Sequence, residues 1–304
     1  MDLQTFLNSR QAGILAFRIS RSLPSGLGHR LARSIADRIS TRRQLPLVQA
    51  IRANRWVVSG EELSGSQLDQ AVRENLRHIA QSFYTLFRCL DDPDASQSLV
   101  VFNPQIEELI IRSQEGKQGV IVAGLHLSNF DLVFQAAALH GLHAVGLSLP
   151  EASQAIEWQH HFRRQAGLEI LSASLANFRQ VIGRLEAGQT VVTGIDRPVK
   201  ESKRKPLFFS RRAHLPVHHI QLALKARVPI VLIGAVLNSD GKYHIHASNY
   251  LEMQQFSDHQ DELLWNAEKV LEIAADMIRL APHQWGVVQP VWPEVLAELP
   301  WEVD

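Results

Sequence analysis

Apolar residues follow two patterns along this chain, one typical of helices and the other of buried strands. Over residues 66–90 they recur every three or four positions, which predicts an amphipathic helix. The residues on this stripe are Leu68, Val72, Leu76, Ile79, Phe83 and Leu86. Short β-branched runs at 120–123 and 228–236 instead predict buried strands.

From residue 103 onward the two patterns alternate. Strands are predicted at 120–123, 144–149, 168–171, 189–194, 206–209, 228–236 and 243–247, and helices at 132–139, 151–166, 175–187, 216–227 and 258–280. Such alternation predicts an α/β fold with a mixed central sheet flanked by helices and preceded by an N-terminal helical layer. We expect a single unit over residues 1–304, with amphipathic helices in 1–55, a helical layer in 56–115 and the α/β core in 116–290.

Length and composition limit the class of protein. The 304 residues, 45% of them hydrophobic, suffice for one large domain or two small ones. The single cysteine, Cys89, excludes an internal disulfide and fits a reducing compartment. Its apolar neighbours predict a small core residue rather than a nucleophile. No apolar run approaches the roughly 18–20 residues of a spanning helix, and no signal-peptide pattern opens the chain.

Charge is unevenly distributed, although the formal net charge is zero. Residues 1–55 contain ten arginines and two acidic residues, a net charge of +8. Apolar residues recur every four positions from Leu27 to Ile39, and arginines occupy the other faces of the same segment. This pattern fits a helix that lies on an anionic membrane surface, and it equally fits a surface helix whose apolar stripe packs on the core.

Candidate chemistry is concentrated in residues 119–131, which read GVIVAGLHLSNFD. A predicted strand leads here through a polar turn into a predicted helix. His126 and Asp131 are able to face one another across this turn, so that the carboxylate would orient the imidazole and stabilise the imidazolium. A second interpretation needs no catalysis: Ser128 caps the next helix, with Asp131 as its capping-box partner.

The segment HLSNFD is similar to the H-x4-D/E motif of the glycerolipid and glycolipid acyltransferases. The surrounding chain resembles the bacterial lipid A biosynthesis (lauroyl/myristoyl) acyltransferase family over about residues 50–290. The other stretches that carry this resemblance are residues 50–54 (AIRAN), 72–88, 162–167 (FRRQAG), 194–198 (GIDRP) with 206–209 (PLFF), and 282–285 (PHQW).

The resemblance implies an O-acyltransferase that moves a fatty acyl group from acyl-CoA or an acyl carrier protein to a hydroxyl of a glycolipid or phospholipid. His126 and Asp131 would be the catalytic pair, with His126 as the general base. The expected substrate-binding residues are Ser128, Asn129, Arg163, Arg164, Asp196 and Arg197, with one of the two adjacent arginines entering the site. No cofactor is expected beyond the acyl thioester co-substrate.

The expected partners are the lipid acceptor, the acyl donor and an anionic membrane surface. The expected location is the cytoplasmic face of the cell membrane, where the protein would be peripheral.

A basic loop at 197–212 is either simply solvated or binds phosphate from a head group, a phosphopantetheine arm, coenzyme A or a membrane. Its charged residues are Arg197, Lys200, Glu201, Lys203, Arg204, Lys205, Arg211 and Arg212. Nucleic acid is not expected as a partner, because no nucleic-acid-binding module accompanies the loop. The histidine pairs of the chain lack a ligand set and an HExxH motif, so no metal site is expected either.

Two rival interpretations stay open. In the first, the protein is an α/β-hydrolase-type lipid esterase. The nearest match to its G-x-S-x-G elbow is residues 146–150, GLSLP, which has proline in place of the last glycine. In the second, the protein is not an enzyme but a peripheral membrane-binding protein that acts through its basic helix.

Overall fold

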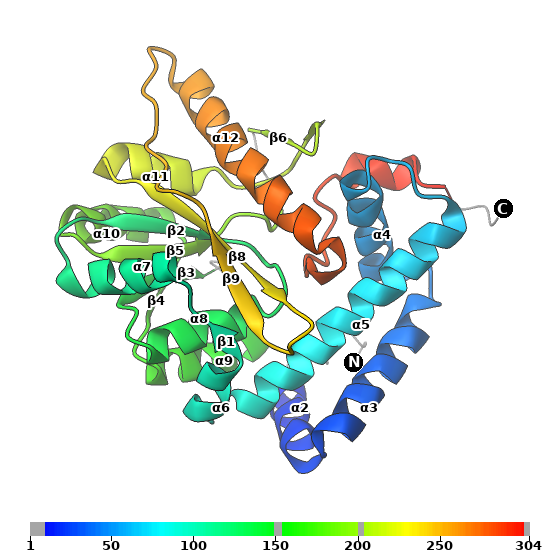
Figure 1. Ribbon diagram of the computed structural model, residues 1–304. Coiled ribbons are helices and arrows are strands. Elements are labelled where there is room, and N and C mark those ends of the chain that lie inside the picture. Colours follow the sequence, from blue (N-terminus) through cyan, green and yellow to red (C-terminus); the bar gives the residue numbers. More distant parts are fainter. Residues whose placement is uncertain (1–9, 149–153, 200–203, 301–304) are drawn as a thin grey trace.

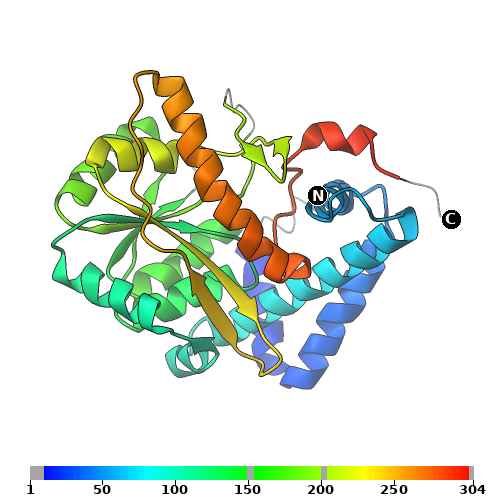
Figure 2. The same ribbon diagram turned by 45° about the horizontal axis from the view of Figure 1, so that its top comes forward.

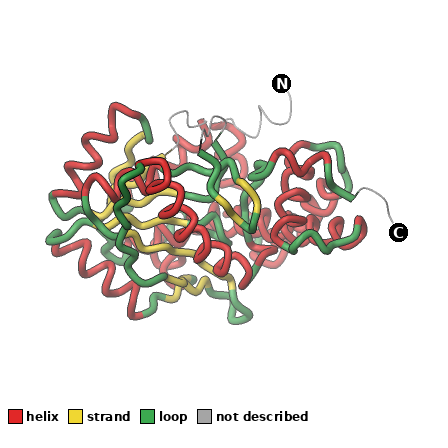
Figure 3. The backbone as a smooth tube through the Cα atoms, turned by 90° about the horizontal axis from the view of Figure 1, so that it is seen from above, coloured by secondary structure: helices red, strands yellow, loops and turns green. Residues whose placement is uncertain are grey.

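A central sheet covered by helices on both faces forms the body of the molecule, and a group of N-terminal helices lies to one side of it (Figure 1). The computed structural model describes residues 10–148, 154–199 and 204–300. Figure 3 shows the strands between two layers of helices, with the N-terminal helices set apart from them.

The sheet has seven strands: β1 (Val100–Val101), β2 (Val120–Gly124), β3 (Ala144–Ser148), β4 (Glu169–Ser172), β5 (Thr190–Gly194), β8 (Ile230–Leu237) and β9 (Tyr243–Ala247). Their order is β1-β9-β8-β2-β5-β3-β4. All pairings in this sheet are parallel except that of β8 with β9. The predicted strand at 206–209 forms a separate hairpin from β6 (Leu207–Phe208) and β7 (Arg211–Arg212).

The longer helices are α2 (Arg10–Ser22), α3 (Ser25–Ser40), α4 (Pro46–Val58), α5 (Gly65–Cys89), α7 (Pro104–Glu115), α8 (Phe130–Leu139), α9 (Gln154–Gln165), α10 (Leu175–Glu186), α11 (His218–Ala226) and α12 (His259–Leu280). Shorter ones are α6 (Pro93–Ser98) and the 3₁₀ turns η1 (Pro282–Gln284) and η2 (Pro293–Ala297). The predicted α/β class, with its mixed sheet, flanking helices and N-terminal helical layer, is confirmed. Among the helices that the structure describes, none is both long enough and apolar enough to cross a membrane.

Strand β2 is buried on both faces, which explains why its sequence is continuously apolar rather than alternating. Ile121 and Ala123 face the cluster that includes residues of α10, α11 and α12. Val120 and Val122 face the opposite side, where they join Leu109 of α7. Strand β2 lies in the middle of the sheet. The turn that follows it therefore lies at the centre of the edge formed by the carboxyl ends of the parallel strands.

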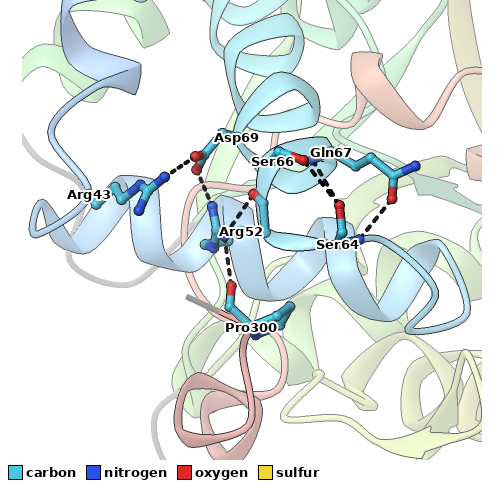
Figure 4. Close-up of polar contacts among 8 residues, drawn as sticks. Arg43, Arg52, Ser64, Ser66, Gln67, Asp69 and Pro300 are labelled. Atoms are coloured by element: carbon cyan, nitrogen blue, oxygen red, sulfur yellow. Dashed lines mark hydrogen bonds and ion pairs between the residues drawn. The ribbon is translucent and has the colours of Figure 1, made fainter. Parts of the chain in front are cut away.

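Helices α4 and α5 are held together by a charge network around the buried Arg52 (Figure 4). Arg52 of α4 is 1% exposed; it forms an ion pair with Asp69 of α5 and donates hydrogen bonds to the carbonyls of Gly65 and Pro300 at 3.0 and 2.8 Å. Arg43 contacts the same carboxylate. A charge as deeply buried as that of Arg52 needs such partners, because loss of the Asp69 carboxylate would leave the guanidinium group buried without a compensating charge.

The start of α5 in the same view has a capping box, in which Ser64 and Gln67 exchange side-chain and backbone hydrogen bonds.

Candidate active site

The register of the sheet places His126 beside Asp196. Gly124 at the end of β2 pairs with Gly194 at the end of the parallel strand β5. His126 and Asp196 each follow two residues later and therefore lie side by side at the carboxyl edge. Nδ1 of His126 lies 2.6 Å from Oδ1 of Asp196, and the backbone N–H of His126 donates to Oδ2 at 2.8 Å.

Asp196 is a fully buried carboxylate that is well supplied with donors. Its third hydrogen bond comes from the indole N–H of Trp285 at 2.8 Å. Burial acts to raise the pKa of Asp196, but the electrostatic interaction with the His126 ring and these hydrogen bonds outweigh it, so that the pKa lies below its ordinary value. The side chain is 0% exposed, against 13% for His126. Asp196 therefore holds Nδ1 of the imidazole on the buried side of the ring, and the His126 side chain keeps a small exposed area.

This arrangement corrects the expected partner of His126. Asp131 lies in the first turn of α8, and its carboxylate forms an ion pair with Arg163 of α9 instead. The two aspartates differ because Asp196 continues the strand next to that of His126, whereas Asp131 has already entered a helix. The sequence motif identified the histidine, but the carboxylate that contacts it comes from the next strand of the sheet.

The turn between His126 and α8 is held by helix α5. Ser128, which has a positive φ of 55°, lies with its hydroxyl 3.1 Å from Nε2 of His78. The amide of Asn129 donates to the carbonyl of Ser82 at 2.9 Å. Asn129, rather than Ser128, is the N-cap of α8, and it forms no side-chain capping hydrogen bond. The expected Ser128 cap is therefore wrong, because the polar side chains of this turn point to α5.

The loop that contains Trp285 is held by the same helix. The amide of Asn75 donates to the carbonyls of His283 and Trp285 at 2.7 and 2.9 Å. The loop in turn contacts the segment that follows β2, since the N–H of Gly286 donates to the carbonyl of His126 at 2.7 Å.

Asn75, His78 and Ser82 were not predicted as site residues. They are three and four residues apart on α5 and therefore lie on one face of this helix. A row of polar residues on a helix face was the sequence signal that could have identified them.

The predicted arginines have different surroundings. Arg163 lines a cavity of about 40 Å³ together with Phe130 and Gly194, next to the imidazole of His126. Arg164 is half exposed and lies 3.9 Å from Glu157. Of these two arginines, Arg163 is the one that lines this cavity. Arg197 follows Asp196 directly, and its buried Nε has no hydrogen-bond partner in the described part of the chain.

The basic loop is largely neutralised within the protein. Lys205 contacts Glu294 at 3.1 Å, and Arg212 contacts Glu268 at 2.9 Å. Arg211 is held between Glu61 and Glu298. Lys200, Glu201 and Lys203 lie outside the described residues. A phosphate-binding role for Lys205, Arg211 and Arg212 would first require these ion pairs to break.

An apolar cavity of about 60 Å³ lies beneath α8. Its wall includes Gly124, Leu125 and Phe130. The ring of Phe130 lies 4.8 Å from the His126 ring, centroid to centroid, and is tilted by 58° with respect to it. The rest of the wall comes from apolar residues of α7, α8 and the sheet. The structure thus places an apolar space next to the histidine. No cluster of three or more potential metal ligands is found among the residues that the structure describes.

One comparison with known proteins identifies the family. Residues 4–294 match the family model of the bacterial lipid A biosynthesis acyltransferases. The chain belongs to this family, and it is an O-acyltransferase with a lipid acceptor. No curated protein matches the sequence.

Proposed function

We propose that the protein transfers a fatty acyl group from acyl-CoA or an acyl carrier protein to a hydroxyl of a glycolipid or phospholipid, as a peripheral protein at the cytoplasmic face of the membrane. The observation that carries this proposal is the contact between His126 and the buried Asp196 at 2.6 Å. A histidine oriented through one nitrogen by a buried carboxylate is suited to act as a base through the other.

In the proposed reaction, neutral His126 donates its Nδ1–H to Asp196 and accepts the proton of the acceptor hydroxyl at Nε2. The hydroxyl oxygen attacks the thioester carbonyl, which forms the new C–O bond and a tetrahedral oxyanion. The intermediate collapses as the C–S bond breaks, and the leaving thiolate takes the proton back from Nε2. Asp196 stabilises the transient imidazolium throughout, as its low pKa keeps it ionised.

The start of α8 supports the oxyanion in this proposal. Its N-cap, Asn129, makes no side-chain hydrogen bond to the first turn, so the N–H groups of that turn are not capped by it. Such groups, together with the helix dipole, favour negative charge. Asp131 contributes indirectly, because its ion pair fixes Arg163 at the edge of the site. Arg163 and Arg197 would then bind the anionic part of a substrate, and Ser128 and Asn129 would fix the turn.

The acyl chain is proposed to enter the apolar cavity at Gly124 and Phe130, with its carbonyl near His126. Burial of methylene groups favours this placement by about 0.8 kcal/mol each. The mechanism uses no cofactor beyond the acyl thioester. Purified protein, incubated with labelled acyl thioester and a lipid acceptor, is expected to release thiol and to form acylated lipid detectable by mass spectrometry. Thiol release that does not depend on the acceptor would contradict transfer.

One contact favours a second candidate function, ester hydrolysis. Oγ of Ser148 lies 3.1 Å from Nε2 of His160, whose Nδ1 lies 3.4 Å from Glu157. It ranks second because His160 is 1% exposed and its Nδ1 forms no hydrogen bond within the described residues. A fluorophosphonate probe distinguishes the two functions. Labelling that is lost in Ser148→Ala would support hydrolysis, and absence of labelling would exclude it.

A further inference from the structure

Helix α3 has two apolar faces, and only one of them packs on the protein. The packed face carries the small residues Gly28, Ala36 and Ser40, which are buried, together with the half-buried Ile39. A Cβ at Gly28 would overlap the ring of Tyr84 on α5, and the Tyr84 hydroxyl donates to the carbonyl of Leu23 at 3.1 Å. Small side chains on this face therefore allow α3 to approach α5 closely. Figures 1 and 2 show α3 lying along α5 at the edge of the molecule.

The other apolar face carries large residues and is exposed. Leu27, Leu31 and Ile35 are 54%, 44% and 47% exposed. Leu15 and Ile19 on the preceding helix α2 are 50% and 40% exposed. Three residues of the predicted stripe on α3 are therefore largely in solvent, whereas the fourth, Ile39, packs on the core cluster that contains Ala36 and Val48.

Four arginines surround this exposed face. Arg30, Arg33, Arg38 and Arg42 are exposed, and no ion pair is found for them within the described residues. The acidic residue of α3, Asp37, is already engaged by Arg77 at 2.6 and 2.8 Å. Arg38 continues the row of Leu27, Leu31 and Ile35 at helical spacing, and Arg42 follows just after the end of α3. An open basin of about 520 Å³ beside them is lined by Arg30, Arg33 and Arg38.

We propose that this surface binds an anionic phospholipid bilayer. The docking face consists of Leu15, Ile19, Leu27, Leu31 and Ile35 together with Arg30, Arg33, Arg38 and Arg42. The apolar row enters the interface between head groups and acyl chains, and the guanidinium groups bind lipid phosphates. The positive charge of this face favours a bilayer over a second copy of the chain, because two copies that met at this face would bring their arginines together.

The docking face is connected to the catalytic site through α2. The ring of Phe17, on the inner side of α2, lies 6.0 Å from that of Phe162 on α9. The next residue on α9 is Arg163, which forms the ion pair with Asp131. Binding of the outer side of α2 to a bilayer therefore brings α9 and its arginine near the lipid surface. This consequence rests on the proposed function, whereas the binding itself does not.

The test is sedimentation of the full-length protein with lipid vesicles, either neutral phosphatidylcholine or an equal mixture with phosphatidylglycerol. The wild type is expected to bind the anionic vesicles at least tenfold more tightly, and to be released as salt rises. Replacing Leu27, Leu31 and Ile35 by serine should weaken binding at least tenfold. Replacing Arg30, Arg33, Arg38 and Arg42 by glutamine should abolish the preference for anionic vesicles.

A matched control uses apolar residues that are equally exposed elsewhere. Ile111 on α7 and Leu280 on α12 are 56% and 61% exposed. Ile111→Ser with Leu280→Ser should leave vesicle binding unchanged. Circular dichroism checks that each variant is folded.

Three results would overturn the docking face. Equal binding to neutral and anionic vesicles is one, and unchanged binding in both face variants is another. The third is a dimer, seen in sedimentation velocity without vesicle binding and lost in the serine variant, which would make a second copy the occupant. Turnover on a detergent-solubilised acceptor is measured in parallel. Retained vesicle binding without any turnover would contradict acyl transfer and leave the docking face standing.

Discussion

The imidazole of His126 lies against the Cα of Gly194, on the neighbouring strand. A Cβ at residue 194 would be 2.9 Å from Cε1 of His126, closer than carbon atoms approach in folded proteins. The absence of a side chain at this position is therefore what allows the ring to reach Asp196. A substitution at Gly194 therefore tests the position of the ring without removing the histidine itself.

Gly194→Ala is expected to lower kcat by one to two orders of magnitude with the protein folded, because the added methyl group displaces the ring from its carboxylate. The matched control is Gly183→Ala on α10, where a Cβ meets nothing within 4 Å. Alanine in a helix is favoured over glycine by roughly 0.5–1 kcal/mol, so this control should be neutral or stabilising. Equal kcat in the two variants would show that the ring position does not matter.

Two tryptophans provide a test of the hydrogen bond to Asp196. Trp285 donates to the buried carboxylate, whereas the buried indole N–H of Trp292 has no partner in the described part of the chain. Trp285→Phe should cost roughly 1.5–3 kcal/mol more in the free energy of unfolding than Trp292→Phe, since a hydrogen bond to a charged group is lost. It should also lower turnover. Urea unfolding of both variants gives the difference, and similar losses would argue against this role of Trp285.

Buried histidines predict acid lability. Burial lowers the pKa of His78 and of His218 to about 4, and that of His219 well below its ordinary 6.5. The unfolded chain binds these protons near pH 6.5, so stability is complete above that pH and falls as the pH drops towards 4. Each histidine contributes a slope of about 1.4 kcal/mol per pH unit inside this window.

Urea unfolding at several pH values between 7 and 4.5 measures this slope. His218→Gln can keep the 2.9 Å hydrogen bond to Thr193. This variant should reduce the slope of stability against pH by the contribution of one histidine. A stability that does not change with pH over the window would contradict the burial of these side chains as neutral groups.

Cys89 is expected to be chemically inert in the folded protein. Burial, and secondarily the charge of Asp92, raise the pKa of its thiol to about 11, so little thiolate exists at neutral pH. Iodoacetamide should modify the unfolded chain but not the native one, and Cys89→Ala should retain turnover within about twofold. Rapid modification of the native protein that also stops transfer would make Cys89 a candidate nucleophile.

Much of the fold was predictable because central strands of the sheet, such as β2 and β8, are buried on both faces. The run at 120–123 corresponds to β2, and that at 228–236 to β8 (Ile230–Leu237). The separate hairpin at 206–209 was not distinguished from a sheet strand, since an apolar run of that length carries no information about its partner.

The site was only partly predictable, for a related reason. His126 could be identified from the turn that follows β2, but its partner Asp196 depends on the pairing of β2 with β5, which is a long-range property. The exposure of Leu27 and Leu31 was also not predictable from the sequence. Helical periodicity identifies the apolar face of a helix, but it does not show whether another part of the protein covers that face.

The central claim is that His126, oriented by Asp196, is the base of acyl transfer. The most direct measurement is the rate of transfer to a lipid acceptor by purified wild type, His126→Ala, Asp196→Asn and Asp131→Asn, with folding checked for each. We expect His126→Ala and Asp196→Asn to lose roughly 10²–10⁴-fold in kcat. Asp131→Asn should lose less and act mainly on KM, because it releases Arg163 rather than the imidazole. Near wild-type kcat in folded His126→Ala, or a larger loss of kcat in Asp131→Asn than in Asp196→Asn, would contradict the account.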